Sequence, residues 1–182
     1  MQTTLNKSLL LIALLSSLPA NSVATAASPP TLTCPTGITN ECTGGLTPVT
    51  YTVTAVDSSG APVPVTCVPP SGTGFRLGNS NVVCTATDSG GRSSSCTFIV
   101  RVVDTTPPRV SCPSNITAQA TSPAGAVVTY VAAASDPCGI ASFDCAPPSG
   151  STFPCGPTTV TCRAVDGTGN AASCSGRHPP RA

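Results

Sequence analysis

A long internal repeat sets the strongest limit on how this chain can fold. Four cysteines of the first half recur exactly 78 residues later: Cys34 as Cys112, Cys67 as Cys145, Cys84 as Cys162, and Cys96 as Cys174. Two six-residue motifs, which begin at Cys67 and Val83, recur at the same offset. Chance does not place so many matches in one register. The sequence therefore predicts two copies of one small module rather than a single domain.

The N-terminal residues predict export from the cell. Lys7 precedes the apolar run 8–18, Pro19 ends it, and Ala24–Ala26 is a small-x-small cleavage site. The run is too short to span a bilayer, and no later segment is long enough, so no membrane span is expected after cleavage. We therefore expect a secreted, extracellular protein. Its parts are a signal peptide (1–26), a first module (27–104), a second module (105–175) and an irregular tail (176–182).

The cysteines are expected to form structural disulfides. The chain has eleven cysteines, only 3% aromatic residues and no tryptophan, so its cores are small. A zinc site needs closely spaced cysteines, but the nearest pairs, such as Cys138 and Cys145, lie seven positions apart. Two disulfides are expected within each set of four matched cysteines, with the same pairing in both copies. Spacing alone leaves three connectivities open for each set.

Three cysteines fall outside the repeat. Cys138 and Cys155 have no counterpart in the first copy, so we expect them to form a third bridge in the second copy. Cys42 lies among polar, turn-forming residues and is expected to be exposed and unpaired. An exposed odd thiol in a secreted protein predicts a homodimer linked through Cys42.

The elements between the cysteines are expected to be strands. Alternation with period two occurs at 49–55, 81–86, 96–103 and 127–131. Alternation places Val82, Cys84 and Ala86 on one face and Cys96, Phe98, Val100 and Val102 on another. Gly, Pro and Ser turns separate the strands, which is typical of a β-sandwich. The expected fold is all-β, with two tandem, disulfide-stapled β-sandwich modules.

The C-terminal residues break this pattern. Residues 175–182 lack apolar alternation, and two prolines there cannot donate ladder hydrogen bonds. The second module is therefore expected to lack its last strand and to leave 158–165 as an open edge. Three explanations remain open. The chain is a fragment or altered end of a longer multi-repeat protein, a partner donates the missing strand, or the disulfides compensate for its loss.

Several acidic and polar residues are candidate binding sites. Five aspartates are candidate calcium ligands: Asp57, Asp88, Asp104, Asp136 and Asp166. Capping of turns by their own side chains is favoured, because no two acids are close in sequence. No metal and no cofactor are predicted. Asn115 begins the sequon Asn115-Ile116-Thr117 and is a candidate for N-glycosylation.

Catalysis and nucleic-acid binding are both disfavoured. The single histidine, His178, lies in the Pro/Arg tail, and no glutamate follows Glu41, so no nucleophile with an adjacent base is predicted. The only lysine is in the signal peptide. The remaining chain has seven Arg, six Asp and one Glu, and so no excess positive charge for phosphates. The sequence predicts a protein that is not an enzyme and does not bind nucleic acid.

The second copy resembles the hyalin-repeat (HYR) family. The resemblance rests on a series of motifs that follow one another along the chain: the linker Asp104–Pro108, Cys112–Thr117, Gly125–Tyr130, Asp136-Pro137-Cys138, Cys145–Phe153, Thr159–Asp166, Gly169-Asn170 and Cys174. The first copy matches from Cys34 to Asp104, with Arg92 in place of the Gly-Asn turn.

The resemblance implies an immunoglobulin-like fold and an extracellular role in adhesion or in binding a protein or glycan ligand. It carries over no catalytic residue. Two classes of function therefore remain, a binding or adhesion module and a passive structural spacer.

Overall fold

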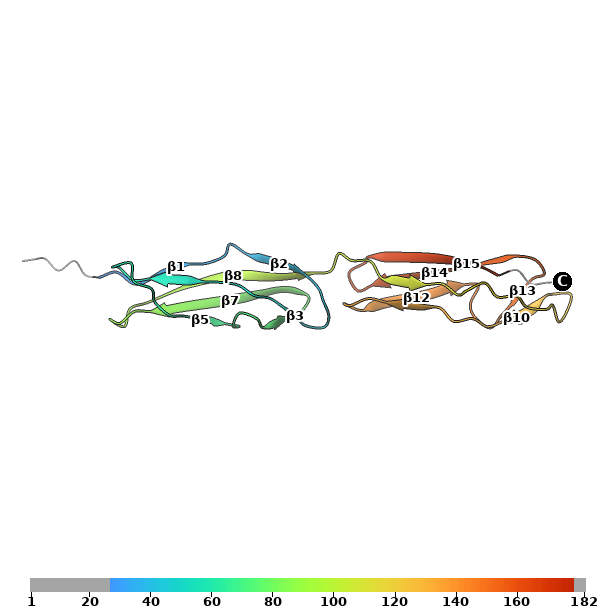
Figure 1. Ribbon diagram of the computed structural model, residues 1–182, viewed down its shortest axis with the longest axis horizontal. Coiled ribbons are helices and arrows are strands. Elements are labelled where there is room, and N and C mark those ends of the chain that lie inside the picture. The colour runs from blue at the N-terminus through green and yellow to red at the C-terminus, as the bar shows by residue number, and fades with distance from the viewer. Residues whose placement is uncertain (1–26, 179–182) are drawn as a thin grey trace, which may run out of the picture.

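The computed structural model describes residues 27–178 and shows two β-modules joined end to end (Figure 1). The signal-peptide interpretation of residues 1–26 lies outside the described residues. Between 27 and 178 no helix is long and apolar enough to cross a membrane. The prediction of two tandem all-β modules stapled by disulfides is confirmed.

The first module is built around a four-stranded sheet. This sheet has the order β2-β8-β7-β5, in which β2 pairs with β8 in parallel and the other pairs are antiparallel. Two short strand pairs, β1-β4 and β3-β6, complete the sandwich. The strands are β1 (Thr31–Thr33), β2 (Ile38–Glu41), β3 (Thr47–Pro48), β4 (Thr54–Val56), β5 (Val65–Val68), β6 (Gly74–Phe75), β7 (Gly78–Thr87) and β8 (Ser93–Val103).

The second module repeats this plan with fewer strands. Its main sheet has the order β12-β14-β15, and the short pairs β9-β11 and β10-β13 complete the sandwich. The strands are β9 (Arg109–Ser111), β10 (Ala126–Val128), β11 (Ala133–Ser135), β12 (Ile140–Ala146), β13 (Ser151–Phe153), β14 (Thr158–Asp166) and β15 (Ala171–His178). No strand in the described part of this module corresponds to β2.

The predicted core faces are confirmed in the two longest strands. Val82, Cys84 and Ala86 of β7 are buried, and so are alternate residues of β8 from Phe98 to Val102. These side chains alternate with exposed ones because neighbouring residues of a strand point to opposite faces. The core of the first module therefore lies against the β7-β8 pair.

The strand predicted over 49–55 is interrupted. The structure has β3 before it and β4 at its end, while the middle bonds to the turn that follows β5. The Tyr51 backbone N donates to Ser71 Oγ (2.8 Å), which itself donates to the Tyr51 carbonyl (2.8 Å). The Tyr51 hydroxyl donates to the Pro69 carbonyl, and its ring packs edge-on against Phe98. A side chain thus takes the place of a ladder partner, which alternation alone does not reveal.

The prediction that the second module lacks its last strand is wrong. β15 pairs with β14 along its whole length, from Ala171 opposite Val165 to His178 opposite Thr158, so 158–165 is not an open edge. Residues 176–178, which were expected to belong to an irregular tail, are part of β15. Strand pairing uses backbone groups, and small residues suffice for the inner face, where Ala172, Cys174 and Gly176 are half-buried.

Candidate functional site at the junction of the two modules

The matched cysteines form the same two bridges in each module. Cys34 pairs with Cys96 and Cys112 with Cys174, each across 62 residues. Cys67 pairs with Cys84 and Cys145 with Cys162, each across 17 residues. In each short bridge the two cysteines are also direct neighbours on adjacent strands. Of the three pairings that spacing left open for each set, both modules therefore have the same one.

The predictions for Cys42 and Cys138 are wrong. Cys42 is 8% exposed and forms a disulfide with Cys138, which lies in the second module. Cys42 directly follows β2, and its backbone N donates to the Val103 carbonyl at the end of β8 (2.7 Å). The repeat pattern relates residues within one copy, whereas this bridge crosses the junction between the two modules. Cys42 is therefore not available to link a homodimer.

The predicted bridge between Cys138 and Cys155 is absent for a geometric reason. Cys138 lies in the turn between β11 and β12, where its bond to Cys42 places it against the first module. Cys155 is free and exposed, and it belongs to the segment between β13 and β14, which lies toward the opposite end of the second module (Figure 1). Both cysteines lack counterparts in the first copy, but this shared property does not make them neighbours.

The linker after β8 is held from the side of the first module by Glu41. Its carboxylate accepts hydrogen bonds from Thr105 N (2.7 Å), Thr105 Oγ1 (3.0 Å) and Thr106 Oγ1 (2.9 Å). These bonds, chiefly the one from the Thr105 backbone, hold the pKa of Glu41 below its ordinary value. A charged Glu41 thus fixes the start of the linker at neutral pH.

The second module binds the same linker through hydrogen bonds from the turn between β14 and β15. Thr168 Oγ1 and Asn170 Nδ2 donate to the Asp104 carbonyl, at 3.1 and 3.0 Å. Asp166 shapes this turn by accepting from Thr168, Gly169 and Asn170. Burial raises the pKa of Asp166, but the hydrogen bonds from Asn170 and Thr168 outweigh it and leave the pKa below its ordinary value. Asp166 is thus a turn cap, as the sequence predicted.

The corresponding turn of the first module makes an analogous contact. Asp88 accepts from Gly90 N and Arg92 N, and forms an ion pair with Arg92 (2.8 Å). Arg92 in turn donates to the carbonyl of Ala27, the residue at which the described chain enters the module (2.7 Å). Each module therefore uses this turn to hold the segment that leads into it.

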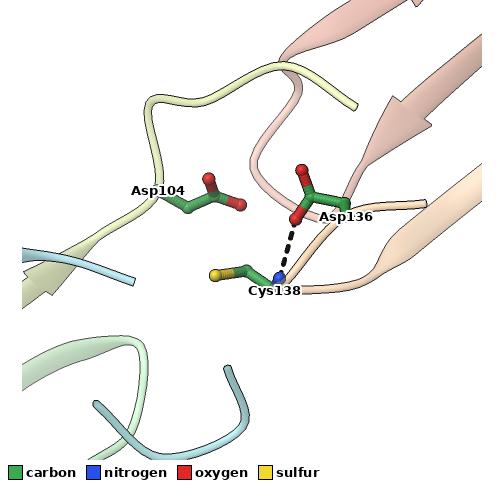
Figure 2. A group of neighbouring side chains, drawn as sticks. All are labelled: Asp104, Asp136 and Cys138. Atoms are coloured by element: carbon green, nitrogen blue, oxygen red, sulfur yellow. Dashed lines mark hydrogen bonds between the residues drawn. The ribbon is translucent and has the colours of Figure 1, made fainter. Parts of the chain in front are cut away.

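Asp104 and Asp136 meet at the centre of the junction (Figure 2). Asp104 follows β8 of the first module, and Asp136 follows β11 of the second. Ligand atoms of these two residues and of Cys138 lie within 4.8 Å of one another. Burial raises the pKa of Asp104 against one opposing hydrogen bond from Thr106 N, and the charges of Asp136, Asp166 and Glu41 raise it further.

The remaining predicted positions lie apart from the junction. Asp57 caps the turn at 57–61 by accepting from Ser59 and Ala61, so turn capping is its role. Asn115 is exposed in the irregular segment after β9. The junction pair of Asp104 and Asp136 was missed as a unit because its members are far apart in sequence. The one available signal was that both lie next to the Pro-containing linker or turn, at the ends of strands.

An open groove runs beside the junction. Its volume is about 510 Å³, and its lining includes Leu77, Asn79, Arg101, Thr105 and Thr168. Residues of both modules and of the linker thus contribute to one concave surface. Leu77, at the position that matches Cys155, is 47% exposed there.

Comparison with known proteins places the chain in a family. A family model described as the HYR domain matches residues 26–102 and 103–177. Hyalin of Strongylocentrotus purpuratus is 39% identical over 155 residues, which are 80% of this chain and 13% of Hyalin. The chain therefore spans only a small part of the length of this relative.

Two solved structures are also similar. Mouse Cadherin-23 EC22-24 matches with a TM-score of 0.34 and 14% identity, over 84% of this chain and 64% of that chain. The fibronectin(III)-like modules of Clostridium thermocellum CbhA match with a TM-score of 0.33 and 18% identity, over 84% and 94%. The family model covers both halves of the repeat, so the chain belongs to the HYR domain family and contains two tandem copies of the domain.

Proposed function

We propose that this chain is a secreted, non-enzymatic adhesion module of the extracellular space that binds a protein or glycan ligand along its side. The proposal is supported by membership of the HYR family and by the five disulfides, which suit an oxidising compartment. The resemblance to hyalin repeats carries no catalytic residue, which agrees with a binding role.

One observation carries the binding proposal, a pair of exposed valines that flank Thr129 on the second module. Residues 127, 129 and 131 face solvent, alternating with the inward-facing Ala126, Val128 and Tyr130. Val127 is 64% exposed and Val131 86%. Exposed apolar groups that cluster on one face are typical of contact surfaces. We therefore place the ligand contact on this face.

A binding screen tests this function. The purified mature chain is applied to arrays of extracellular proteins and glycans, and hits are measured by surface plasmon resonance. The double variant Val127→Asp/Val131→Asp should weaken binding at least tenfold, because each charge would have to be desolvated in the contact. Val83→Asp, at an exposed valine of the first module, is the matched control and should bind as the wild type does. Equal loss in both variants, or no hit at all, would refute the assignment.

A second function, that of a passive spacer, is favoured by the Cys42–Cys138 bridge. A covalent tie between modules fixes their separation without any ligand. A spacer predicts a rod-like scattering profile and no ligand in the same screen. Binding that depends on Val127 and Val131 would instead support the adhesion module.

We also propose that Asn115 carries an N-linked glycan when the chain is made by a eukaryotic secretory pathway. Its exposure in an irregular segment leaves the side chain accessible. Expression in such a host should give a mass increase that Asn115→Gln removes. An unchanged mass in the wild type would refute the proposal.

A further inference from the structure

We propose that the outer edge of β12 in the second module binds an extended segment of a partner protein, which adds a strand to the sheet. The segment would place apolar side chains into the groove beside β12 and a basic side chain next to Asp144. This site rests on the proposed binding function and deepens it, because it commits to a protein ligand and to one mode of recognition. Strand addition recognises a ligand through its backbone and through its alternate side chains.

β12 is an edge strand of the main sheet of the second module. It pairs with β14 on one side, and no described strand pairs with it on the other (Figure 1). Cys145 and Cys162 are direct partners in this ladder, and their Cα atoms are 4.0 Å apart. So short a separation is typical of an antiparallel pair whose backbone groups do not bond to each other. The N–H and C=O of Cys145 therefore point outward, away from β14.

The alternation of the ladder extends this open edge to Phe143. Phe143 lies two residues before Cys145 and opposite Ala164, so its N–H and C=O also point away from β14. Within residues 27–178 these backbone groups have no strand or turn partner. A row of unpaired N–H and C=O groups along a sheet edge is a template for another strand.

A groove of about 390 Å³ runs beside this edge. Its apolar lining comes from the segment Tyr130–Ala132 and from Phe143 and Pro148. Val131, within that segment, is 86% exposed. In a strand added to β12, every second side chain would point to the same side as Phe143 and therefore into the groove. The groove thus favours apolar side chains at alternate positions of the partner segment.

The first module has the same groove in a narrower and less apolar form. Its volume is about 290 Å³, and Thr52 and Val65 occupy the positions of Val131 and Phe143. β5, the strand at this edge, has four residues, whereas β12 has seven. We therefore assign the partner segment to the second module.

Asp144 determines the charge expected of the partner segment. It is exposed between the half-buried Phe143 and Cys145, so its side chain lies on the outer face of the sheet. Arg163 stands opposite on β14, but over the described residues Asp144 takes part in no ion pair. A Lys or Arg next to Asp144 on an added strand would form a favourable cross-strand pair. The expected recognition pattern is therefore apolar, basic, apolar.

Selection of peptides by the full secreted chain tests this site. A library of random peptides of about ten residues, displayed on phage, is panned against the immobilised chain, and enriched sequences are synthesised. They should share the apolar, basic, apolar pattern. Hydrogen exchange followed by NMR should show that peptide binding protects the Phe143 and Cys145 amides at least tenfold. The Asp144 amide, which faces β14, is the internal control and should change little.

Three substitutions test the side chains of the site. Val131→Asp should weaken peptide binding at least tenfold, because it places a charge in the apolar groove. Thr52→Asp, at the matching groove position of the first module, is the matched control and should bind as the wild type does. Asp144→Asn should weaken binding about threefold for peptides with the basic residue, and should leave peptides with Thr in its place unchanged.

The proposal is overturned if no peptide is enriched, or if enriched peptides leave the Phe143 and Cys145 amides unprotected. Equal loss of binding in Val131→Asp and Thr52→Asp would also overturn it. Failure of this site is distinguishable from failure of the proposed function. A protein or glycan hit in the binding screen with both amides unprotected would refute strand addition alone. Protected amides with no hit in that screen would refute the adhesion function and leave the edge site in place.

Discussion

The two modules share one plan, but the first has the larger core. Eight buried residues form the core of the first module and four that of the second. Much of the difference lies at the end of the last strand. Phe98, Val100 and Val102 are buried in β8, whereas the matching positions of the second copy are Gly176, His178 and Pro180. The second module thus keeps the strand while losing most of the apolar area that the first gains from it.

A second difference between the modules concerns the parallel strand β2. β2 pairs with β8 from Val100 to Val103. The matching stretch of the second copy begins at His178, where β15 ends, and continues with two prolines that have no N–H to donate. The described part of the second module has no equivalent of β2. Both modules keep the two disulfides and the tyrosine hydroxyl hydrogen bond, although the Tyr51 ring packs on Phe98 and the Tyr130 ring on Phe153, which are not matching positions.

Removal of the long disulfide should have the largest effect and should separate the modules. Each long bridge closes 62 residues, so its loss costs roughly 4 kcal/mol in the chain-entropy model. The double variant Cys112→Ala/Cys174→Ala should unfold the second module, whose core is small. Cys34→Ala/Cys96→Ala should leave the first module folded but weakened. Hydrogen exchange of β14 and β7 measures each module separately. Loss of protection in β7 with β14 intact would contradict the comparison.

The tyrosine contact should contribute equally to both modules. The Tyr51 and Tyr130 hydroxyls donate to the carbonyls of Pro69 and Pro147, and each ring packs edge-on against a phenylalanine. Tyr51→Phe and Tyr130→Phe should each cost about 1 kcal/mol, because they remove the hydrogen bond and keep the ring. Urea unfolding followed by hydrogen exchange in each module gives the two values. A loss of unfolding free energy in one module only would show that the tyrosine hydrogen bond does not stabilise the two modules equally.

The capping turns should produce a smaller effect that depends on pH and salt. The pKa values of Asp88 and Asp166 are lowered, since burial raises each but hydrogen bonds lower it more. Because the pKa of each carboxyl is lower in the folded state than its unfolded value of 3.8, the charged carboxylate stabilises the folded module above about that pH. This stabilisation is lost as the pH falls through the folded pKa. Acid should therefore weaken both modules, which thermal unfolding against pH would record.

Salt should distinguish the two turns. Asp88 is paired with the charged Arg92, and Asp166 with the neutral amide of Asn170. High NaCl should weaken the first turn and leave the second unchanged, because screening acts on charge pairs. Asp88→Asn should remove the salt dependence of the first module. Equal salt dependence in Asp88→Asn and the wild type would argue against the ion pair.

Sequence reasoning predicted most of the repeated parts of the molecule, but it missed the last strand of the second copy and the parts that exist once. The offset of the repeat predicted both sets of disulfide cysteines, and alternation predicted the buried faces of β7 and β8. The last strand was missed because Ala172 and Gly176 bury little apolar area, although their backbone pairs normally.

The junction could not be predicted from either copy. Cys42 and Cys138 are 96 residues apart, and Asp104 meets Asp136 only because the modules lie end to end. A repeat describes how residues pack within a copy and contains no information about which ends meet. For the same reason, the predicted bridge between Cys138 and Cys155 was wrong: it rested on the lack of counterparts in the first copy and not on where the two cysteines lie in the module.

The most direct test of this account is disulfide mapping of the non-reduced protein. After alkylation of free thiols and proteolysis, mass spectrometry should find a peptide that contains Cys42 bonded to one that contains Cys138. Cys155 should be the labelled thiol. A bond between Cys138 and Cys155, or a labelled Cys42, would contradict the covalent tie between the modules and with it the account of the junction.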